Sequence, residues 1–120
     1  MFVNLSNHSS DKWDEPQLSA AKLYGDIEDI SFPIIAAEDD EASISILADQ
    51  YCNKICALYQ PRRDVIHVMG EMCFSFALIK RLQKKGFVCL ASTTERNVKE
   101  GELGLKEVCF QFVRFRKYEY

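Results

Sequence analysis

The segment from Asp64 to Gly70 places the strongest constraint on how this chain can fold. It reads Asp64-Val65-Ile66-His67-Val68-Met69-Gly70, a continuous apolar run that contains one histidine. A strand that is apolar on both faces is typical of the centre of a parallel sheet covered by helices on both sides. His67 lies in the middle of this strand, and we interpret it as a core histidine with satisfied hydrogen bonds.

Helical and strand-like patterns alternate along the rest of the chain. Apolar residues at positions 44, 47, 48, 51, 55, 58 and 59 follow helical spacing and predict a helix over about 39–59. The acidic run Glu38-Asp39-Asp40-Glu41 suits the positive end of that helix, and Pro61 follows its end. We predict further helices over about 14–24 and 71–85, strands over 2–5, 26–32, 87–91 and 108–115, and a polar loop over 97–105.

The resulting order, βαβαβαββ, predicts an α/β fold. Alternating units of this kind form a parallel sheet with helices on both faces, here a Rossmann-like three-layer domain. The final strand is expected to run antiparallel, because the connection before it is too short for a helical crossover. A chain of 120 residues has the length of one domain, so residues 1–120 form a single unit.

Composition excludes several classes of protein. Eighteen acidic and fifteen basic residues give a net charge of −3, so no broad basic surface is available for duplex nucleic acid. No apolar run approaches the length of a membrane helix. The five cysteines lie in apolar runs without zinc-site spacing, which favours reduced core thiols, a cytoplasmic protein and no metal. The glycine motifs of NAD sites and P-loops are absent, so no cofactor is expected.

Polar residues follow three of the predicted strands at their carboxyl ends. In an open parallel sheet, ligands bind in the crevice beyond those ends. The residues that we expect to meet there are Asn4, Ser6, Asn7, His8 and Ser9 after the first strand, Gly70 and Glu71 after the central strand, and Ser92, Thr93, Thr94 and Arg96 after the fourth.

These side chains supply hydroxyls, amides, an imidazole and a guanidinium, which suit a phosphate or a nucleotide edge. The helix that begins near Glu71 adds free N–H groups and a positive dipole end. Each piece also has a structural interpretation: the loop after the first strand as an ordinary capped loop, Ser92 to Thr94 as a strand end, and Glu71 as a complement to the helix dipole.

The segments Asn4 to His8, His67 to Glu71 and Ala91 to Arg96 resemble those of small single-domain CRISPR-associated proteins. These are type III accessory proteins with a reduced, CARF-like Rossmann domain. The resemblance extends over nearly the whole chain in layout, and the Ser-Thr-Thr-Glu-Arg run is its most specific part. It implies a homodimer that binds a cyclic oligoadenylate across its two-fold axis, for antiviral defence.

The same resemblance implies a metal-independent ring nuclease, in which a ribose 2′-oxygen attacks the adjacent phosphate. His8 would act as the general acid or position the reacting groups, and Arg96 would hold the phosphate with Thr93 or Thr94. Two alternatives stay open: a non-catalytic nucleotide sensor or sponge, and a protein-interaction module. The final strand from Val108 to Phe115 carries apolar residues on both of its faces, so it is expected either to form a dimer contact or to be buried by helices.

Overall fold

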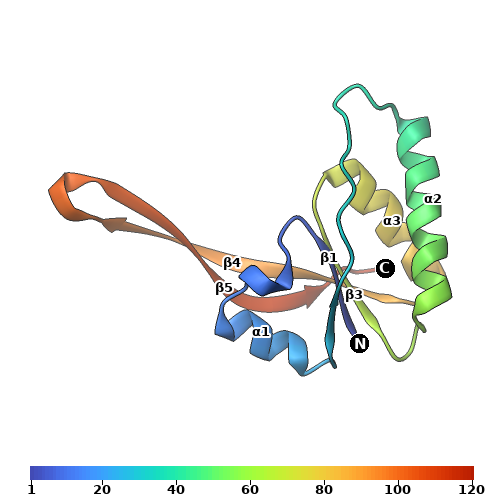
Figure 1. The fold of residues 1–120 in the computed structure, drawn as a ribbon, viewed down its shortest axis with the longest axis horizontal. Coiled ribbons are helices and arrows are strands. Elements are labelled where there is room, and N and C mark those ends of the chain that lie inside the picture. The colour runs from blue at the N-terminus through green and yellow to red at the C-terminus, as the bar shows by residue number, and fades with distance from the viewer.

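The structure, a computed structural model, describes residues 1–120. Its strands are β1 (Phe2–Ser6), β2 (Ile27–Asp29), β3 (Val65–Met69), β4 (Val88–Glu100) and β5 (Lys106–Lys117). Its helices are α1 (Glu15–Lys22), α2 (Glu41–Leu58) and α3 (Met72–Lys84), with short 3-10 turns η1 (Ser10–Lys12) and η2 (Glu102–Gly104). The predicted order of strands and helices is confirmed (Figure 1).

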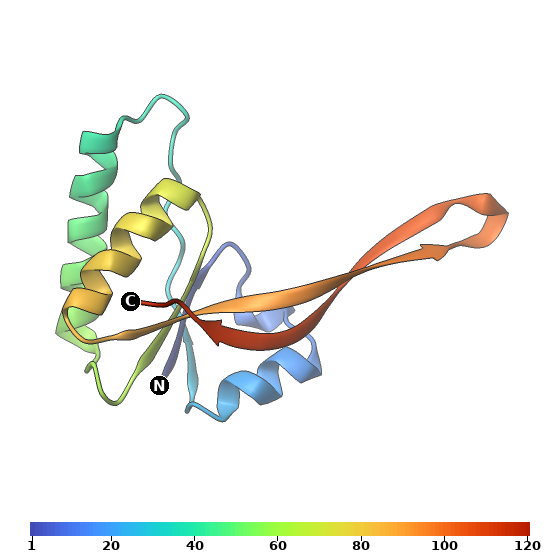
Figure 2. The same ribbon diagram turned by 180° about the vertical axis from the view of Figure 1, so that it is seen from behind.

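One five-stranded sheet has the order β2-β1-β3-β4-β5, and only the β4–β5 pair is antiparallel. Helices α2 and α3 cover one face, and α1 lies on the other (Figures 1 and 2). Val3, Ile66 and Val68 belong to the large core beneath α2 and α3, whereas Phe2 and Leu90 pack with Ala21 of α1. The predicted Rossmann-like three-layer fold, mostly parallel with an antiparallel final strand, is therefore confirmed.

Acidic side chains begin the two longer helices. Asp40 accepts a hydrogen bond at 3.0 Å from the backbone N–H of Ser43 at the start of α2, as the acidic run predicted. Glu71 accepts from the N–H groups of Cys73 and Phe74 at the start of α3. Each carboxylate satisfies N–H groups that have no partner inside the helix.

The loop predicted over 97–105 is wrong. Strand β4 continues through Glu100, and β5 pairs with it from Lys106 onward, so that only residues 101–105 make the turn. The two strands form a hairpin that projects from the body of the molecule (Figures 1 and 2). Polar residues are tolerated here because strand pairing satisfies the backbone while the side chains face solvent.

A β-bulge changes which side chains share a face of this hairpin. Thr93 pairs with Arg114 but Thr94 pairs with Phe112, so Val113 is the extra residue. Phe112 and Phe115 consequently lie on the same side, with ring centroids 4.8 Å apart. The final strand was expected to carry apolar residues on both faces; the bulge collects its phenylalanines on one face, whereas Cys109 lies on the other.

The cysteines are only partly in the core. Cys52 and Cys89 are buried, and burial raises the pKa of the Cys89 thiol to about 12. Cys56, Cys73 and Cys109 are exposed, contrary to the prediction, because an apolar stretch of sequence does not settle which face of an element each residue occupies. All five are free thiols.

Candidate functional site

The order of the strands creates a switch point between β1 and β3. From β1 the chain passes to β2 on one side through α1, and then returns through α2 to β3 on the other side. Loops therefore diverge to opposite faces where β1 and β3 end, and ligands of open α/β sheets bind at such a point. The N–H of Asn7 donates to the carbonyl of Met69 at 3.3 Å, which joins the two strand ends.

A cavity of about 620 Å³ opens at this switch point, on the α1 side of the sheet. Six of the sequence-predicted residues line it: Ser6, Asn7, His8, Gly70, Ser92 and Thr94. The remaining walls come from the η1–α1 segment (Lys12, Trp13, Asp14 and Gln17), from β3 (His67 and Met69) and from β5 (Phe110 and Phe112).

Five other predicted residues lie outside this cavity. Asn4 and Ser9 line a smaller hollow of about 280 Å³ toward Asp29 of β2. Thr93 faces the opposite side of β4, where its hydroxyl donates to the carbonyl of Arg114 at 3.1 Å. Arg96 is exposed on the projecting hairpin, two residues beyond Thr94.

Glu71 is the fifth, and its position changes the expected chemistry of the site. Its carboxylate occupies the first N–H groups of α3, and the side chain lines a hollow on the α2–α3 face. The helix end that we expected to receive a ligand anion is therefore filled by the protein's own carboxylate. The structural interpretation of Glu71, a complement to the helix dipole, is the one that the geometry matches.

Asn4 is the centre of a polar network behind the cavity. Its Nδ2 donates to Asp29 Oδ1 at 2.8 Å and to the carbonyl of His8 at 2.9 Å, while its Oδ1 accepts from Ser6 at 2.8 Å. Ser10 donates to the same carboxylate from both its backbone N–H and its hydroxyl. Burial acts to raise the pKa of Asp29, but the hydrogen bonds from Ser10 and Asn4 outweigh it and hold that pKa below its ordinary value.

His67 lies between this network and the cavity. It is 1% exposed, and its Nδ1 lies 2.9 Å from Asn4 Oδ1. The rings of Phe2, Trp13 and Phe115 surround it, with centroids 5.3 to 5.7 Å away. Burial lowers the pKa of His67 to about 4, so the ring is neutral at pH 7.

The prediction for His67 was only half correct. The residue is in the core, but its Nε2 has no hydrogen-bond partner within the chain. It also lines the cavity, which the sequence analysis had assigned to His8 alone.

Sequence reasoning missed Lys12, Trp13 and Gln17, which come from the segment between β1 and β2. No local sequence pattern marks these three residues as part of a site, because only the path of η1 and α1 over the sheet brings them to the strand ends. It also missed Phe110 and Phe112, which belong to the final strand and had been connected only with a contact role.

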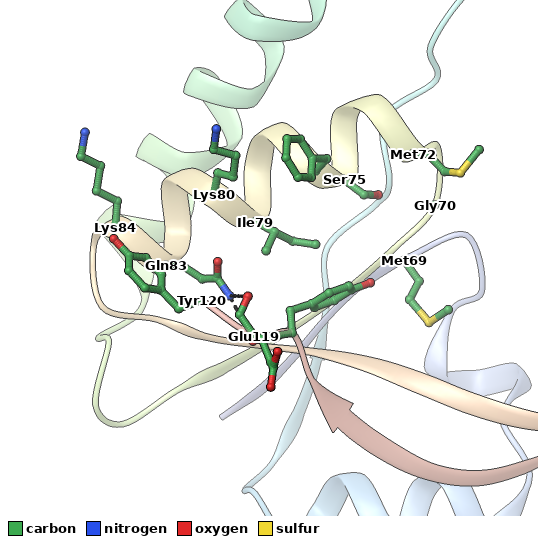
Figure 3. A pocket seen from close by; sticks show the side chains of 12 residues that line it. Met69, Gly70, Met72, Ser75, Ile79, Lys80, Gln83, Lys84, Glu119 and Tyr120 are labelled. Carbon is green, nitrogen blue, oxygen red and sulfur yellow. Dashed lines mark hydrogen bonds between the residues drawn. The ribbon is translucent and has the colours of Figure 1, made fainter.

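A larger cavity, of about 860 Å³, lies between α3 and the segment Tyr118 to Tyr120 (Figure 3). Ile79 points toward that segment, whereas the ammonium groups of Lys80 and Lys84 extend from the helix away from it (Figure 3). Gln83 donates to the carbonyls of Tyr118 and Glu119. Of the predicted residues only Gly70 reaches this mainly apolar space, so we take the switch-point cavity as the candidate site despite its smaller size.

The arrangement at the switch point is suited to binding a mixed polar and aromatic ligand. Aromatic rings from Trp13, Phe110 and Phe112 face hydroxyls and amides from the strand ends, with Lys12 as a cation. No group of three or more histidine, cysteine or acidic side chains is arranged to hold a metal ion. None of the three helices has the length and apolar character needed to cross a membrane.

Comparison with known families matches residues 1–116 to the family described as Uncharacterized protein MJ1673. The match covers nearly the whole chain, and the protein belongs to this family. No curated protein and no solved structure gives a significant match.

Proposed function

We propose that this protein binds a cyclic oligoadenylate at the switch-point cavity, as a cytoplasmic CRISPR-associated nucleotide-binding protein of antiviral defence. One observation carries the proposal: three aromatic side chains and a lysine converge with the polar strand ends in a single cavity. Aromatic faces stack on nucleobases, and hydroxyls, amides and a cation bind ribose and phosphate.

The size of the cavity supports one nucleotide per chain. About 620 Å³ lies within the range of small-ligand sites, whereas a ring of several nucleotides needs more room. A homodimer with two cavities facing a shared two-fold axis supplies it. The ring then contacts the same residues of both copies, as an isologous assembly requires.

The projecting hairpin offers the surface for such a dimer. We define the arm as residues 94–112, and its apolar face as Val98, Val108, Phe110 and Phe112. Three of these side chains are 46 to 66% exposed, and Phe110 and Phe112 also line the cavity. An apolar strand face of this kind is a contact surface when a partner covers it. A second copy lying on the arm would also close the cavity on that side.

Ring opening is the finer form of the proposal. The ribose 2′-oxygen attacks the adjacent phosphorus, the bond from phosphorus to the 5′-oxygen breaks, and a 2′,3′-cyclic phosphate and a 5′-hydroxyl result. The 2′-hydroxyl proton passes to water, and His8 at the cavity edge donates a proton to the leaving oxygen. Lys12, and Arg96 from the arm, stabilise charge on the phosphoryl oxygens.

Binding is tested by thermal shift and titration calorimetry with cyclic tetra- and hexaadenylate, linear oligoadenylate and NAD. A cyclic ligand at about 100 times its dissociation constant should add about 2.7 kcal/mol of stability. Lys12→Ala should weaken binding, whereas Lys22→Ala, an exposed lysine outside the cavity, should not. Equal shifts for NAD and the cyclic ligands, or none for any ligand, would refute the proposal.

Two further measurements test the homodimer and the ring-opening step separately. Sedimentation should give a dimer at micromolar concentration, and Phe110→Ser should weaken it, whereas Phe76→Ser, equally exposed on α3, should not. Chromatography of the bound ring after incubation without metal detects the cyclic phosphate product. An intact ring that stays bound would identify a sponge and exclude the ring nuclease.

A further inference from the structure

The unpartnered Nε2 of His67 is a hydrogen-bond acceptor held in one chemical form by its neighbours. Asp29 is ionised and can only accept hydrogen bonds, so the Asn4 atom that faces it must be the amide nitrogen. The Asn4 oxygen therefore faces His67 Nδ1, at 2.9 Å. Nδ1 must then carry the ring proton.

The neutral ring consequently leaves Nε2 with a lone pair and no proton. The direction of the hydrogen bonds from His67 to Asn4 and from Asn4 to Asp29 is fixed, because the Asp29 carboxylate also accepts two hydrogen bonds from Ser10. The rings of Phe2, Trp13 and Phe115 hold the imidazole on its other sides. Nε2 is thus an acceptor whose direction and protonation are both fixed before any ligand arrives.

A buried acceptor without a partner costs about 1–3 kcal/mol of stability. The cost disappears when a ligand entering the cavity donates an N–H or O–H to it. A ligand that places an acceptor at the same point gains nothing and meets lone-pair repulsion.

We propose that His67, whose ring lines the switch-point cavity and whose Nε2 is buried without a partner, accepts at that nitrogen a hydrogen bond from the exocyclic amine of an adenine base, and so selects adenine over hypoxanthine. The inference rests on the proposed function and names the residue that sets the base preference of the cavity. Adenine carries a donor where hypoxanthine carries a carbonyl oxygen, and its ring fits among the aromatic side chains of the cavity. A ribose hydroxyl is the other neutral donor that an adenine nucleotide could present.

The experiment compares three probes by calorimetry: cyclic tetraadenylate, cyclic tetrainosinate and 2′-deoxy cyclic tetraadenylate. We expect the inosine ring to bind at least tenfold more weakly than the adenine ring, and the deoxy ring to keep the same dependence on His67. In His67→Phe the difference between adenine and inosine should disappear. This variant conserves aromatic volume, and Asn4 Oδ1 keeps its bond from Ser6, so the fold is expected to survive.

Ser75→Ala is the matched control. Ser75 Oγ is the other buried side-chain atom without a partner, and it lines the cavity beside α3. Its removal should leave base preference unchanged. If His67→Phe does not fold, the ¹⁵N resonance of Nε2 in the parent protein decides the question, since it should be of the unprotonated type and shift on binding adenine but not inosine.

Each outcome has a distinct meaning. Equal binding of the adenine and inosine rings would overturn the inference while leaving the proposed function standing. It is the result that a purely structural histidine would give. A loss of binding confined to the deoxy ring would assign Nε2 to the ribose and overturn the adenine assignment. Binding of none of the rings would refute the proposed function itself.

Discussion

The ring of Phe32 lies against Gly70 in the space that a side chain at position 70 would occupy. A Cβ atom on Gly70 would overlap three carbon atoms of that ring. Phe32 in turn packs edge-on against Phe74 of α3, with centroids 5.3 Å apart. The turn from β3 into α3, which forms one side of the candidate site, therefore depends on a residue with no side chain.

Gly70→Ala should lower the free energy of unfolding by about 2 kcal/mol, because an added methyl group in a packed region forces its neighbours to move. Urea denaturation measures the change. In a Phe32→Ala background the same substitution should cost much less, since the overlapping ring is gone. An unchanged cost in that background would mean that the contact with Phe32 is not the reason for glycine at this position.

Asp64→Asn should lower the free energy of unfolding by about 3 kcal/mol. The Asp64 side chain is fully buried and accepts from the Gln60 N–H at 2.8 Å, from Arg63 and from the amino group of Met1. An amide presents N–H groups to some of these donors and leaves them unpaired. Asp49→Asn is the control, because Asp49 is 62% exposed and its ion pair with Arg81 should contribute less than about 1 kcal/mol.

Stability should fall as the pH is lowered from about 6.5 to about 4, through His67. Burial depresses the pKa of His67 to about 4 in the folded chain, so over this range the unfolded chain binds more protons than the folded one. The full loss is about 3 kcal/mol, at about 1.36 kcal/mol per unit of pKa difference. Urea titrations across this range should show the slope in the parent protein and not in His67→Phe.

A second loss should begin at lower pH, through Asp64. Burial alone would raise the pKa of that carboxyl, but the bonds from Arg63 and the Met1 amino group hold it well below its usual range. Its contribution is therefore complete above about pH 4 and is lost as the pH falls further. His67→Phe should retain this second phase, and Asp64→Asn should reduce it to the part that other carboxylates with a lowered pKa, such as Asp29, contribute.

Arg96→Ala should leave the free energy of unfolding within about 0.5 kcal/mol of the parent, because the side chain is exposed on the arm. Binding of cyclic tetraadenylate should weaken by about 1.5–3 kcal/mol if its phosphate contacts the guanidinium, and Arg96→Lys should recover only part of the loss. Arg62→Ala, at an exposed turn that precedes β3 and outside the switch-point cavity, is the control. Parent-like affinity in Arg96→Ala would remove this residue from the site.

Much of the architecture could be predicted from local pattern. The apolar run from Asp64 to Gly70 determined a central strand, helical spacing from Ile44 to Tyr59 determined α2, and Asp40 marked where it begins. These features depend on periodicity and capping within a few residues, which the sequence displays directly. The gathering of Ser6, His8, Gly70, Ser92 and Thr94 in one cavity also followed, because parallel strands end at the same edge of a sheet.

The roles of the individual site residues depend on contacts between distant segments, which only the tertiary structure shows. The capping role of Glu71 and the arm that carries Arg96 depend on hydrogen-bond partners that local pattern does not name. The same holds for His67, which looks like an ordinary core residue until Asn4 of β1 fixes its proton on one nitrogen and leaves the other buried without a partner at the edge of the cavity. Pattern along a chain determines which elements form, whereas the protonation and exposure of a single atom depend on neighbours brought together by folding.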